Sequence, residues 1–491
     1  MSRAPGEPGA PGVPAGGPAM TDRGPGAAAT AAAAATTAAT RPAAVRALAP
    51  VVRTGRRYGR RLAVASLDLA VRGAAALAPR GASAKAPPRQ PRSLFVLRNN
   101  DVGDLLAVTP LFEALRRLFP EAWIAAGVGD WNLPVLRHNP FLSEALTVNA
   151  PWHNKYQGRR RPWHRLLYVW RSAEVRELAR RRFEVGIDVL GSGWGSLLML
   201  RAGIPYRMGV RGYAGGDAAV QAAVSFDPAE HVGRSALRFA QLLGAAWLPE
   251  VRPQLFLSAA EAEAGERWWS AGEASARRPR VVIGPGGGLA AKRWPAASFA
   301  ALAAGLAAPG GPSLLVIGGA GERELAADVT AAAASVAPCR GLAEPPGLRE
   351  VFSLVAACDL VVCNSSMLLH VAAAFAKPAV VLLGPAFSSA SQHQRQWGYA
   401  GLSTSLGREP GASERICEPA EALRAVRERL AAIAGAGGDE AAGTGGTRRS
   451  GGHGNTGGAG NTGGVADTGG AGDTGNPGDI GSAGEQRRSV R

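Results

Sequence analysis

Through the middle of the chain, short apolar runs alternate with helical patterns, and the series occurs twice. The strand-like runs lie at 93–98, 123–128, 184–189, 280–284, 313–318, 359–363 and 379–383. A helical pattern follows the first run at 105–119, and another closes the series at 421–433. Apolar strands separated by helices predict a parallel sheet that is covered on both faces. We therefore predict an α/β protein with two lobes, at 93–255 and 256–434, and a ligand-binding cleft between them.

The two ends of the chain differ in composition from this body. Residues 1–92 are rich in Ala, Pro and Gly and carry 14 of the 55 Lys and Arg residues against three acids. With so few large apolar side chains, this extension is predicted to be mostly disordered. A short basic helix within 53–78 would lie on a membrane surface or act as a solvated linker. Residues 435–491 repeat Asn-Thr-Gly-Gly and Asp-Thr-Gly-Gly units, which predicts a disordered low-complexity tail.

Net charge and cysteine content limit the functional classes. The formal net charge is +17, of which +11 falls in residues 1–92, −1 in the tail and +7 in the body. Nucleic-acid binding is the alternative that this charge suggests, but no groove-reading motif supports it. Four cysteines do not make a disulfide framework, and no run approaches the roughly 18 apolar residues of a membrane span. We expect a cytoplasmic protein and leave open a peripheral association with the cytoplasmic membrane.

The first candidate site segment follows the run at 93–98. Gly103 allows a tight turn, and Asp104 would then lie at a strand-to-helix junction with its carboxylate in the cleft. The alternative for Asp104 is an ordinary role at the start of a helix. Asp101 lies in the same turn. Further along, the basic and aromatic stretch 152–182, with Arg159 and Arg160, suits an anionic ligand or forms a solvated basic helix face.

The second segment, 284–295, is glycine-rich and also follows a strand. Backbone N–H groups at Gly286 and Gly287, with a helix N-terminus behind them, favour an anion. Lys292 is one of only four lysines in a chain otherwise biased towards arginine, which suggests a point charge for a phosphate. A surface lysine without a ligand is the alternative. The segment is not a Walker A loop, because Arg293 follows the lysine.

The third and fourth segments also lie just after strands. Glu322 and Glu324 would accept hydrogen bonds from ribose hydroxyls, or would simply favour the first turn of a helix. Asn364, Ser365 and Ser366 would cap the next helix and face a diphosphate. His370 lies one turn inside that helix and points at the ligand or into the core.

In this order, the segments resemble glycosyltransferase family 9, the heptosyltransferase-like enzymes. The family's three motifs are matched by Arg98, Gly103, Asp104, Thr109 and Pro110; by Lys292, Trp294 and Pro295; and by Asn364, Ser366, His370, Gly384 and Pro385. The resemblance covers about 93–434 and excludes both extensions. Two positions depart from the family pattern, where Ser365 replaces an acid and Met367 replaces a glycine.

The resemblance implies a GT-B architecture, with two Rossmann-like lobes that bind the acceptor in the first and the donor in the second. It implies an inverting, metal-independent transfer of heptose or a related sugar from a nucleotide-diphosphate sugar, here an ADP-sugar, without a cofactor. The acceptor would be an anionic glycan or glycolipid of the lipopolysaccharide or cell envelope, contacted by Arg98, Asp101, Arg159 and Arg160. Asp104 would be the general base, and Lys292 and Ser366 would meet the leaving nucleotide. The departures leave a non-catalytic nucleotide-binding member as the alternative, and no nucleic-acid partner is expected.

Overall fold

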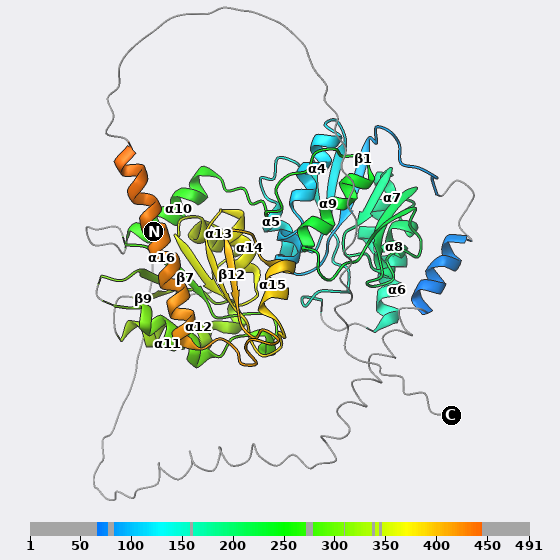
Figure 1. The fold of residues 1–491 in the computed structure, drawn as a ribbon. Coiled ribbons are helices and arrows are strands. Elements are labelled where there is room, and N and C mark those ends of the chain that lie inside the picture. The colour runs from blue at the N-terminus through cyan, green and yellow to red at the C-terminus, as the bar shows by residue number, and fades with distance from the viewer. Residues whose placement is uncertain are drawn as a thin grey trace, which may run out of the picture. The chain divides into compact units, whose positions relative to one another are not determined.

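In a computed structural model of the chain, the structure describes residues 66–76, 83–157, 161–271, 278–308, 310–335, 339–342 and 346–443, with side chains up to residue 435. The disorder predicted for most of 1–92 and for the tail falls largely outside these ranges. Two sheets with their covering helices make up the described residues (Figure 1). The predicted domain limits at 255 and 434 stay predictions.

The first sheet contains six parallel strands in the order β3-β2-β1-β4-β5-β6. Their bounds are β1 Ser93–Leu97, β2 Trp123–Val128, β3 Glu144–Thr147, β4 Val185–Asp188, β5 Tyr206–Arg211 and β6 Ala222–Ser225. The chain runs outward from β1 to β3 and then returns to the other side of β1 at β4. Ligands bind at such a reversal in open α/β sheets, outside the carboxyl ends of the strands.

The second sheet repeats this topology. It has the order β12-β11-β10-β7-β8-β9, and the reversal lies between β7 and β10. The strands are β7 Arg280–Gly284, β8 Ser313–Val316, β9 Cys339–Gly341, β10 Leu360–Cys363, β11 Ala379–Leu382 and β12 Ser403–Leu406. The segments after β1, β7 and β10, which the sequence patterns placed just after strands, therefore all lie at reversal points.

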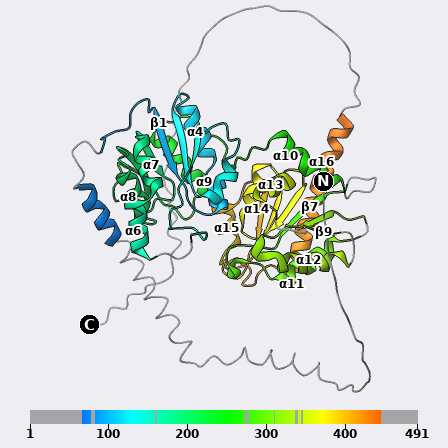
Figure 2. The ribbon, with the colours of Figure 1, turned by 180° about the vertical axis from the view of Figure 1, so that it is seen from behind.

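Helices cover both faces of each sheet, as Figures 1 and 2 show. In the first lobe they are α3 Val102–Leu106, α4 Pro110–Leu118, α5 Leu133–Leu136, α6 Pro162–Arg171, α7 Ala173–Arg181, α8 Gly193–Arg201 and α9 Val232–Leu242. In the second lobe they are α10 Ala259–Ser270, α11 Ala296–Leu306, α12 Arg323–Ala334, α13 Leu348–Ala356, α14 Met367–Ala374, α15 Ala390–Trp397 and α16 Pro419–Gly443. Short 3-10 turns are η1 Asp130–Asn132, η2 Ala290–Lys292 and η3 Ala320–Glu322. None of the described helices combines the length and apolar character needed to cross a bilayer.

Side chains of β7 point alternately into two different cores, which explains why the sequences of such strands are continuous apolar runs. Val281 and Ile283 pack in a core with α11 and α16, whereas Val282 packs in a separate core with α13 and α14. Each strand is thus buried on both faces, which requires apolar side chains at consecutive positions. The strands that the patterns missed are β3, β5, β6, β9 and β12. β3, β9 and β12 are short and only partly buried, so their sequences lack such a run.

The helical pattern at 105–119 is two helices rather than one. α3 ends at Leu106, and α4 begins with Pro110 as its first residue. Proline lacks a backbone N–H and clashes with the preceding turn, so it starts a helix and does not sit inside one. The Thr109 hydroxyl donates to the Leu106 carbonyl at 2.8 Å and satisfies one carbonyl at the break.

Part of the N-terminal extension packs on the first lobe. Residues 66–76 form a helix in which Val71 is buried in the same core as Phe95 and Val169. Arg72 forms an ion pair with Asp217 at 3.5 Å. The helix predicted within 53–78 therefore forms over these residues, but its apolar side is held by the protein. Val71 is thus held by the lobe, whereas residues 53–65 of the predicted helix lie outside the described residues, so the choice between a linker and a membrane-lying helix stays a prediction.

Candidate active site

Buried polar side chains shape the turn after β1. Asn99 Nδ2 donates to the carbonyls of Ala150 at 3.3 Å and Trp152 at 3.1 Å, and Asn100 Nδ2 donates to the His153 carbonyl at 3.0 Å. Both side chains are nearly inaccessible to solvent. An amide buried in this way must keep its hydrogen bonds, so the turn is fixed to the segment at 150–153.

Asp104 is the third residue of α3 and faces the side chain of Arg98. An Arg98 nitrogen lies 3.5 Å from the Asp104 carboxylate, and Arg98 Nε donates to the Asp104 carbonyl at 3.3 Å. Burial raises the pKa of Asp104, while the charges of Arg98 and Lys292 and the N–H of Asp101 lower it. Asp104 still has 30% of its side chain exposed, so the carboxylate is accessible to a second molecule.

Asp101 precedes α3 at its N-cap position without making a capping bond to the helix. Its carboxylate instead accepts a hydrogen bond from the Lys155 N–H at 3.2 Å. Its negative charge also contributes to the raised pKa of Asp104. Asp101 therefore lies beside the proposed base and holds the segment at 150–155. Arg159 and Arg160 lie outside the described residues.

The glycine-rich turn after β7 already holds an anionic side chain. The Gly287 N–H donates to Glu322 Oε1 at 2.7 Å, and the Gly319 N–H donates to Glu322 Oε2 at 3.1 Å. Arg293 lies 3.6 Å from the same carboxylate. A Cβ at Gly286 would collide with this carboxylate, so a larger residue there would require the Glu322 side chain to move away. The turn thus presents the Gly287 N–H to an anionic side chain, and the phosphate contact expected of Gly286 and Gly287 stays a prediction.

Asn364 holds the backbone of the glycine-rich turn in place through its side-chain amide. Its Nδ2 donates to the carbonyls of Pro285 at 2.7 Å and Gly286 at 2.9 Å, and its Oδ1 accepts from the Trp294 N–H at 2.7 Å. The residue is 1% exposed. Because its amide is buried and fully hydrogen-bonded, Asn364 positions the backbone of the turn. No atom of its side chain is exposed to make the phosphate contact that the sequence predicted.

Lys292 brings a positive charge to the meeting point of the two lobes. It ends η2 and is exposed, and it has no ion-pair partner among the residues that the structure describes. Its ammonium lies 5.7 Å from the centre of the Phe387 ring. Its charge lowers the pKa of Asp104 in the first lobe and that of His393 in the second. The lysine of the second lobe therefore acts electrostatically on the carboxylate that the sequence singled out in the first lobe.

His370 lies in the core, the second of its two predicted places. It is 5% exposed, and its Nδ1 lies 2.6 Å from the Tyr399 hydroxyl. Burial lowers the pKa of His370 to about 3, so the ring is neutral at pH 7. A Cβ at Gly103 would lie 3.1 Å from His370 Cδ2. His370 therefore packs α14 against the residue that precedes Asp104.

Ser365 belongs to a hydrogen-bond chain that sequence patterns did not reveal. Gln394 Nε2 donates to the Ser403 carbonyl at 3.0 Å, which makes its Oε1 the acceptor for the Ser405 hydroxyl at 2.9 Å. Ser405 Oγ then accepts from His393 Nδ1 at 2.8 Å, and His393 Nε2 is left to accept from the Ser365 hydroxyl at 2.8 Å. Each donor fixes the next acceptor. The lone pairs of Ser365 Oγ thus remain to accept a hydrogen bond.

The uncharged state of His393 keeps this order of donors and acceptors. Burial lowers the pKa of His393 to about 4, and the charge of Lys292 lowers it as well. The family motif contains neither His393 nor Ser405, and 28 residues separate His393 from Ser365 in the sequence. No pattern in the sequence signals this pairing, because the contact forms only when α15 packs beside the end of β10.

The remaining predicted residues lie around the same strand ends. Ser366 is the N-cap residue of α14, and its hydroxyl makes no capping bond. The first N–H groups of that helix are therefore not capped by this side chain. Glu324 lies exposed in the first turn of α12. Within the described part of the chain, no group of three or more His, Cys, Asp or Glu side chains is arranged to hold a metal ion.

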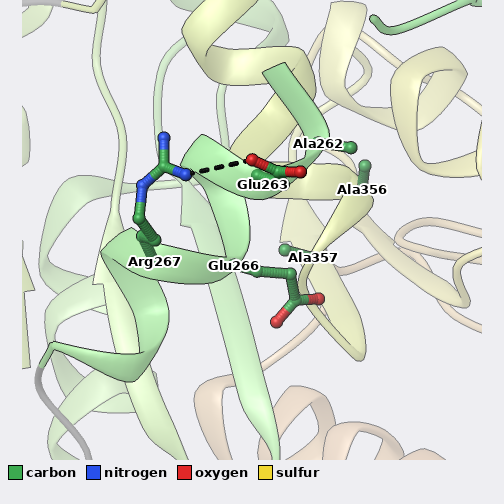
Figure 3. A pocket seen from close by; sticks show the side chains of 6 residues that line it. All are labelled: Ala262, Glu263, Glu266, Arg267, Ala356 and Ala357. Carbon is green, nitrogen blue, oxygen red and sulfur yellow. Dashed lines mark hydrogen bonds and ion pairs between the residues drawn. The ribbon is translucent and has the colours of Figure 1, made fainter. Parts of the chain in front are cut away.

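A surface pocket lies apart from these residues. It has a volume of about 440 Å³ and is lined by Ala262, Glu263, Glu266, Arg267, Ala356 and Ala357, from α10 and the end of α13 (Figure 3). Its charged side chains are already paired, Glu263 with Arg267 at 3.3 Å and Glu266 with Arg280 at 2.6 Å. None of the predicted site residues lines it, so it is not the candidate active site.

Comparison with known proteins decides the family. Residues 171–399 match the family model described as glycosyltransferase family 9 (heptosyltransferase). The chain is 30% identical over 311 residues to lipopolysaccharide heptosyltransferase 2 of Salmonella typhimurium, a match that covers 60% of this chain and 82% of the relative. The chain belongs to glycosyltransferase family 9. Its identity to lipopolysaccharide heptosyltransferase 2 of Escherichia coli is 29%, with the same coverage of each chain.

Solved structures of the family share the fold. A glycosyl transferase family 9 protein from Veillonella parvula aligns with a TM-score of 0.57 and 16% identity, over 70% of this chain and 98% of that one. The ADP-heptose lps heptosyltransferase II of E. coli aligns with a TM-score of 0.54 and 23% identity, over 69% and 99%. The two-lobe architecture is GT-B, and this member of family 9 is a glycosyltransferase.

Proposed function

We propose that the enzyme transfers a heptose or related sugar from an ADP-sugar to a hydroxyl of a glycan or glycolipid acceptor of the lipopolysaccharide core type. The relatives' names describe lipopolysaccharide heptosyltransferases, and one solved neighbour is described as a heptosyltransferase with ADP. The proposal rests on the packing of α3, which holds Asp104, against α14 of the second lobe, and on the exposed Lys292 in the turn after β7, whose charge lowers the pKa of Asp104. This pair supplies a base for the acceptor and a counter-charge for the donor.

Asp104 acts as the general base. Its carboxylate takes the proton from the acceptor hydroxyl, whose oxygen forms a bond to the anomeric carbon of the donor sugar. The bond from that carbon to the diphosphate oxygen breaks, and the nucleoside diphosphate leaves with the electron pair. Attack opposite the leaving group inverts the anomeric configuration. Burial raises the pKa of Asp104, which makes it a stronger base than a fully solvated carboxylate.

The second lobe stabilises the leaving diphosphate. The Lys292 ammonium, the Gly287 N–H and the uncapped N-terminus of α14 at Ser366 supply positive charge and donors at the ends of β7 and β10. These groups take the place that a divalent cation fills in other transferases. Glu324 is exposed near these strand ends and is the better placed candidate for a ribose contact, because Glu322 is already bonded to the glycine-rich turn.

Ser365 accepts a hydrogen bond from a hydroxyl of the donor sugar. The chain through His393 orients its hydroxyl hydrogen away from the ligand, so its oxygen acts as an acceptor in place of the family's acidic side chain. A neutral acceptor forms a weaker hydrogen bond than a carboxylate does. The preference of this enzyme among donor sugars should therefore differ from that of relatives that have an acidic residue at this position.

A turnover screen tests the proposed function. The full chain is incubated with ADP-, UDP- and GDP-linked sugars and a heptose-containing core acceptor, and the products are measured by mass spectrometry. We expect transfer with an ADP-sugar and release of ADP. Tight binding of ADP in calorimetry together with no transfer to any acceptor would instead support the non-catalytic alternative, which the departures at Ser365 and Met367 motivate.

A further inference from the structure

Helix α6 carries a stripe of large apolar side chains that faces solvent. Trp163, Leu166, Leu167 and Trp170 are 51%, 48%, 41% and 48% exposed. Their spacing of three and four residues places them on one side of the helix. Four neighbouring exposed apolar residues on one helix form a patch, and a patch of this kind marks a surface that binds something.

The other side of α6 holds the helix to the lobe. Val169 is fully buried, and the Tyr168 ring packs edge-to-face against Trp152 with centres 5.4 Å apart. The Tyr168 hydroxyl donates to Glu174. A helix on a globular protein ordinarily buries its apolar stripe and exposes its polar one. In α6 the anchoring side carries His164, Arg165 and Tyr168, and no segment among the described residues covers the apolar stripe.

Arginines surround this stripe. Arg161, Arg171 and Arg176 are exposed and have no acidic partner within the described residues. The two acids of α7 are already engaged, Glu174 by Tyr168 and Glu177 by two arginines of its own helix. The surface of α6 and α7 is therefore apolar along one line and positive beside it.

We propose that α6 lies flat on an anionic lipid bilayer. Trp163 and Trp170 lie at the depth of the headgroups, Leu166 and Leu167 enter the start of the acyl region, and the arginines meet lipid phosphates. The helix has ten residues, so it lies along the surface and does not cross the membrane. Figure 1 shows α6 along the lower edge of the first lobe.

The positive charge of this surface favours an anionic bilayer over two other partners, which are the N-terminal segment of the chain and a second copy of the protein. Residues 1–65 contain nine arginines and only Glu7 and Asp22 as acids, so this segment is repelled by the arginines beside the stripe. A second copy of the same surface brings the same positive charge. An anionic bilayer is the partner that matches both the apolar stripe and its arginines.

The location of α6 relative to Asp104 gives the contact between α6 and the bilayer a role in the reaction. This role rests on the proposed function. The segment at 150–155 precedes α6 and is bonded to the turn after β1 through Trp152 and Lys155. Docking of α6 would therefore bring the bilayer to the side of the lobe that carries Asp101 and Asp104. A lipid-linked acceptor could then reach the base without leaving the membrane.

Vesicle binding by the full chain tests the proposal without any need for turnover. The protein is co-sedimented with vesicles of phosphatidylglycerol and phosphatidylethanolamine, and with vesicles of phosphatidylcholine. We expect preference for the anionic vesicles and about tenfold weaker binding for Trp163→Ser combined with Trp170→Ser. Trp123→Ser is the matched control, because Trp123 is 49% exposed and lies on β2. Arg161→Glu combined with Arg171→Glu should also weaken binding to anionic vesicles, with the apolar stripe intact.

Hydrogen exchange localises the contact. We expect the peptides that cover α6 to exchange more slowly when anionic vesicles are added. Unchanged vesicle binding in both paired variants, or protection confined to residues 1–65, would overturn the proposal. So would a dimer in sedimentation velocity that the paired tryptophan variant converts to a monomer, because a second copy would then be the occupant. Loss of vesicle binding with normal sugar transfer to a soluble acceptor would separate this surface from the active site.

Discussion

The two lobes have the same strand order and opposite chemistry at the ends of their strands. In the first lobe, β1 leads into two carboxylates, Asp101 and Asp104, with Arg98 beside them. In the second, β7 leads into backbone N–H groups and an exposed ammonium. Because the sheets are alike, the difference comes from the turns alone. In the proposed function, one scaffold used twice would thus supply a base for one substrate and a counter-charge for the other.

The sharpest test of this division is Asp104→Asn. The amide keeps the size of the side chain but does not accept a proton, so we expect the rate of transfer to fall by about 10²–10⁴-fold. The affinity for ADP in calorimetry should change little, because the diphosphate is met by the other lobe. Transfer at the wild-type rate would show that the first lobe does not supply the base.

Lys292→Met tests the second lobe. Removal of a charge-assisted contact to phosphate should weaken ADP binding by about 10–100-fold, as measured by calorimetry. Lys377→Met is the control, since it removes a lysine from the turn after α14 and leaves the glycine-rich turn untouched. Equal affinity for ADP in the two variants would contradict the phosphate role.

The buried histidines near the contact between α3 and α14 make the stability pH-dependent. Burial lowers the pKa of His370 to about 3 and those of His231 and His393 to about 4, against about 6.5 in the unfolded chain. The unfolded state therefore binds protons first as the pH falls below about 6.5. Each histidine should then lower the free energy of unfolding by about 1.4 kcal/mol per pH unit until its own folded pKa is reached.

Denaturant unfolding at pH 7, 6 and 5 measures this slope. His393→Gln should reduce it, whereas His138→Asn should not, because His138 is about half exposed. A free energy of unfolding that does not change between pH 7 and pH 5 would contradict the neutral, buried state assigned to these rings.

The smallest expected effect concerns Ser365. Ser365→Ala removes one neutral hydrogen bond, so the KM for the nucleotide-sugar should rise by about 2–10-fold. The affinity for ADP, which lacks the sugar, should stay the same. His393→Leu should produce a similar change, because it removes the acceptor that orients the Ser365 hydroxyl. An equal loss of ADP affinity in Ser365→Ala would place this serine on the diphosphate instead of the sugar.

Sequence patterns predicted the fold where a strand is buried on both faces. The runs that became β1, β7, β10 and β11 are apolar at consecutive positions, so they are visible without a structure. β5 was missed although it is largely buried, because it contains Arg207. The guanidinium of that residue is buried and donates to the Ala219 carbonyl at 2.7 Å, which a hydropathy pattern does not foresee.

The sequence predicted which turns form the candidate site, but it did not predict which side chains contact one another there. Asp104 and Lys292 were identified because each follows a strand, and strand ends gather at one edge of a sheet. The engagement of Asn364 with the glycine-rich turn and that of Ser365 with His393 join residues far apart in the chain. Such pairings depend on how two elements pack, which a local motif does not encode.

If the glycine-rich turn binds the donor diphosphate as proposed, the Glu322 carboxylate on that turn affects how long the nucleotide stays bound. Any anion that takes the Gly287 N–H has to displace this side chain first, so its observed affinity is reduced by the strength of the bond that is lost. After transfer, the same carboxylate is tethered nearby and can return to the turn at high effective concentration. Departure of the spent nucleotide from this proposed site would then be an exchange of one anion for another, which would favour rapid turnover over tight retention of the product.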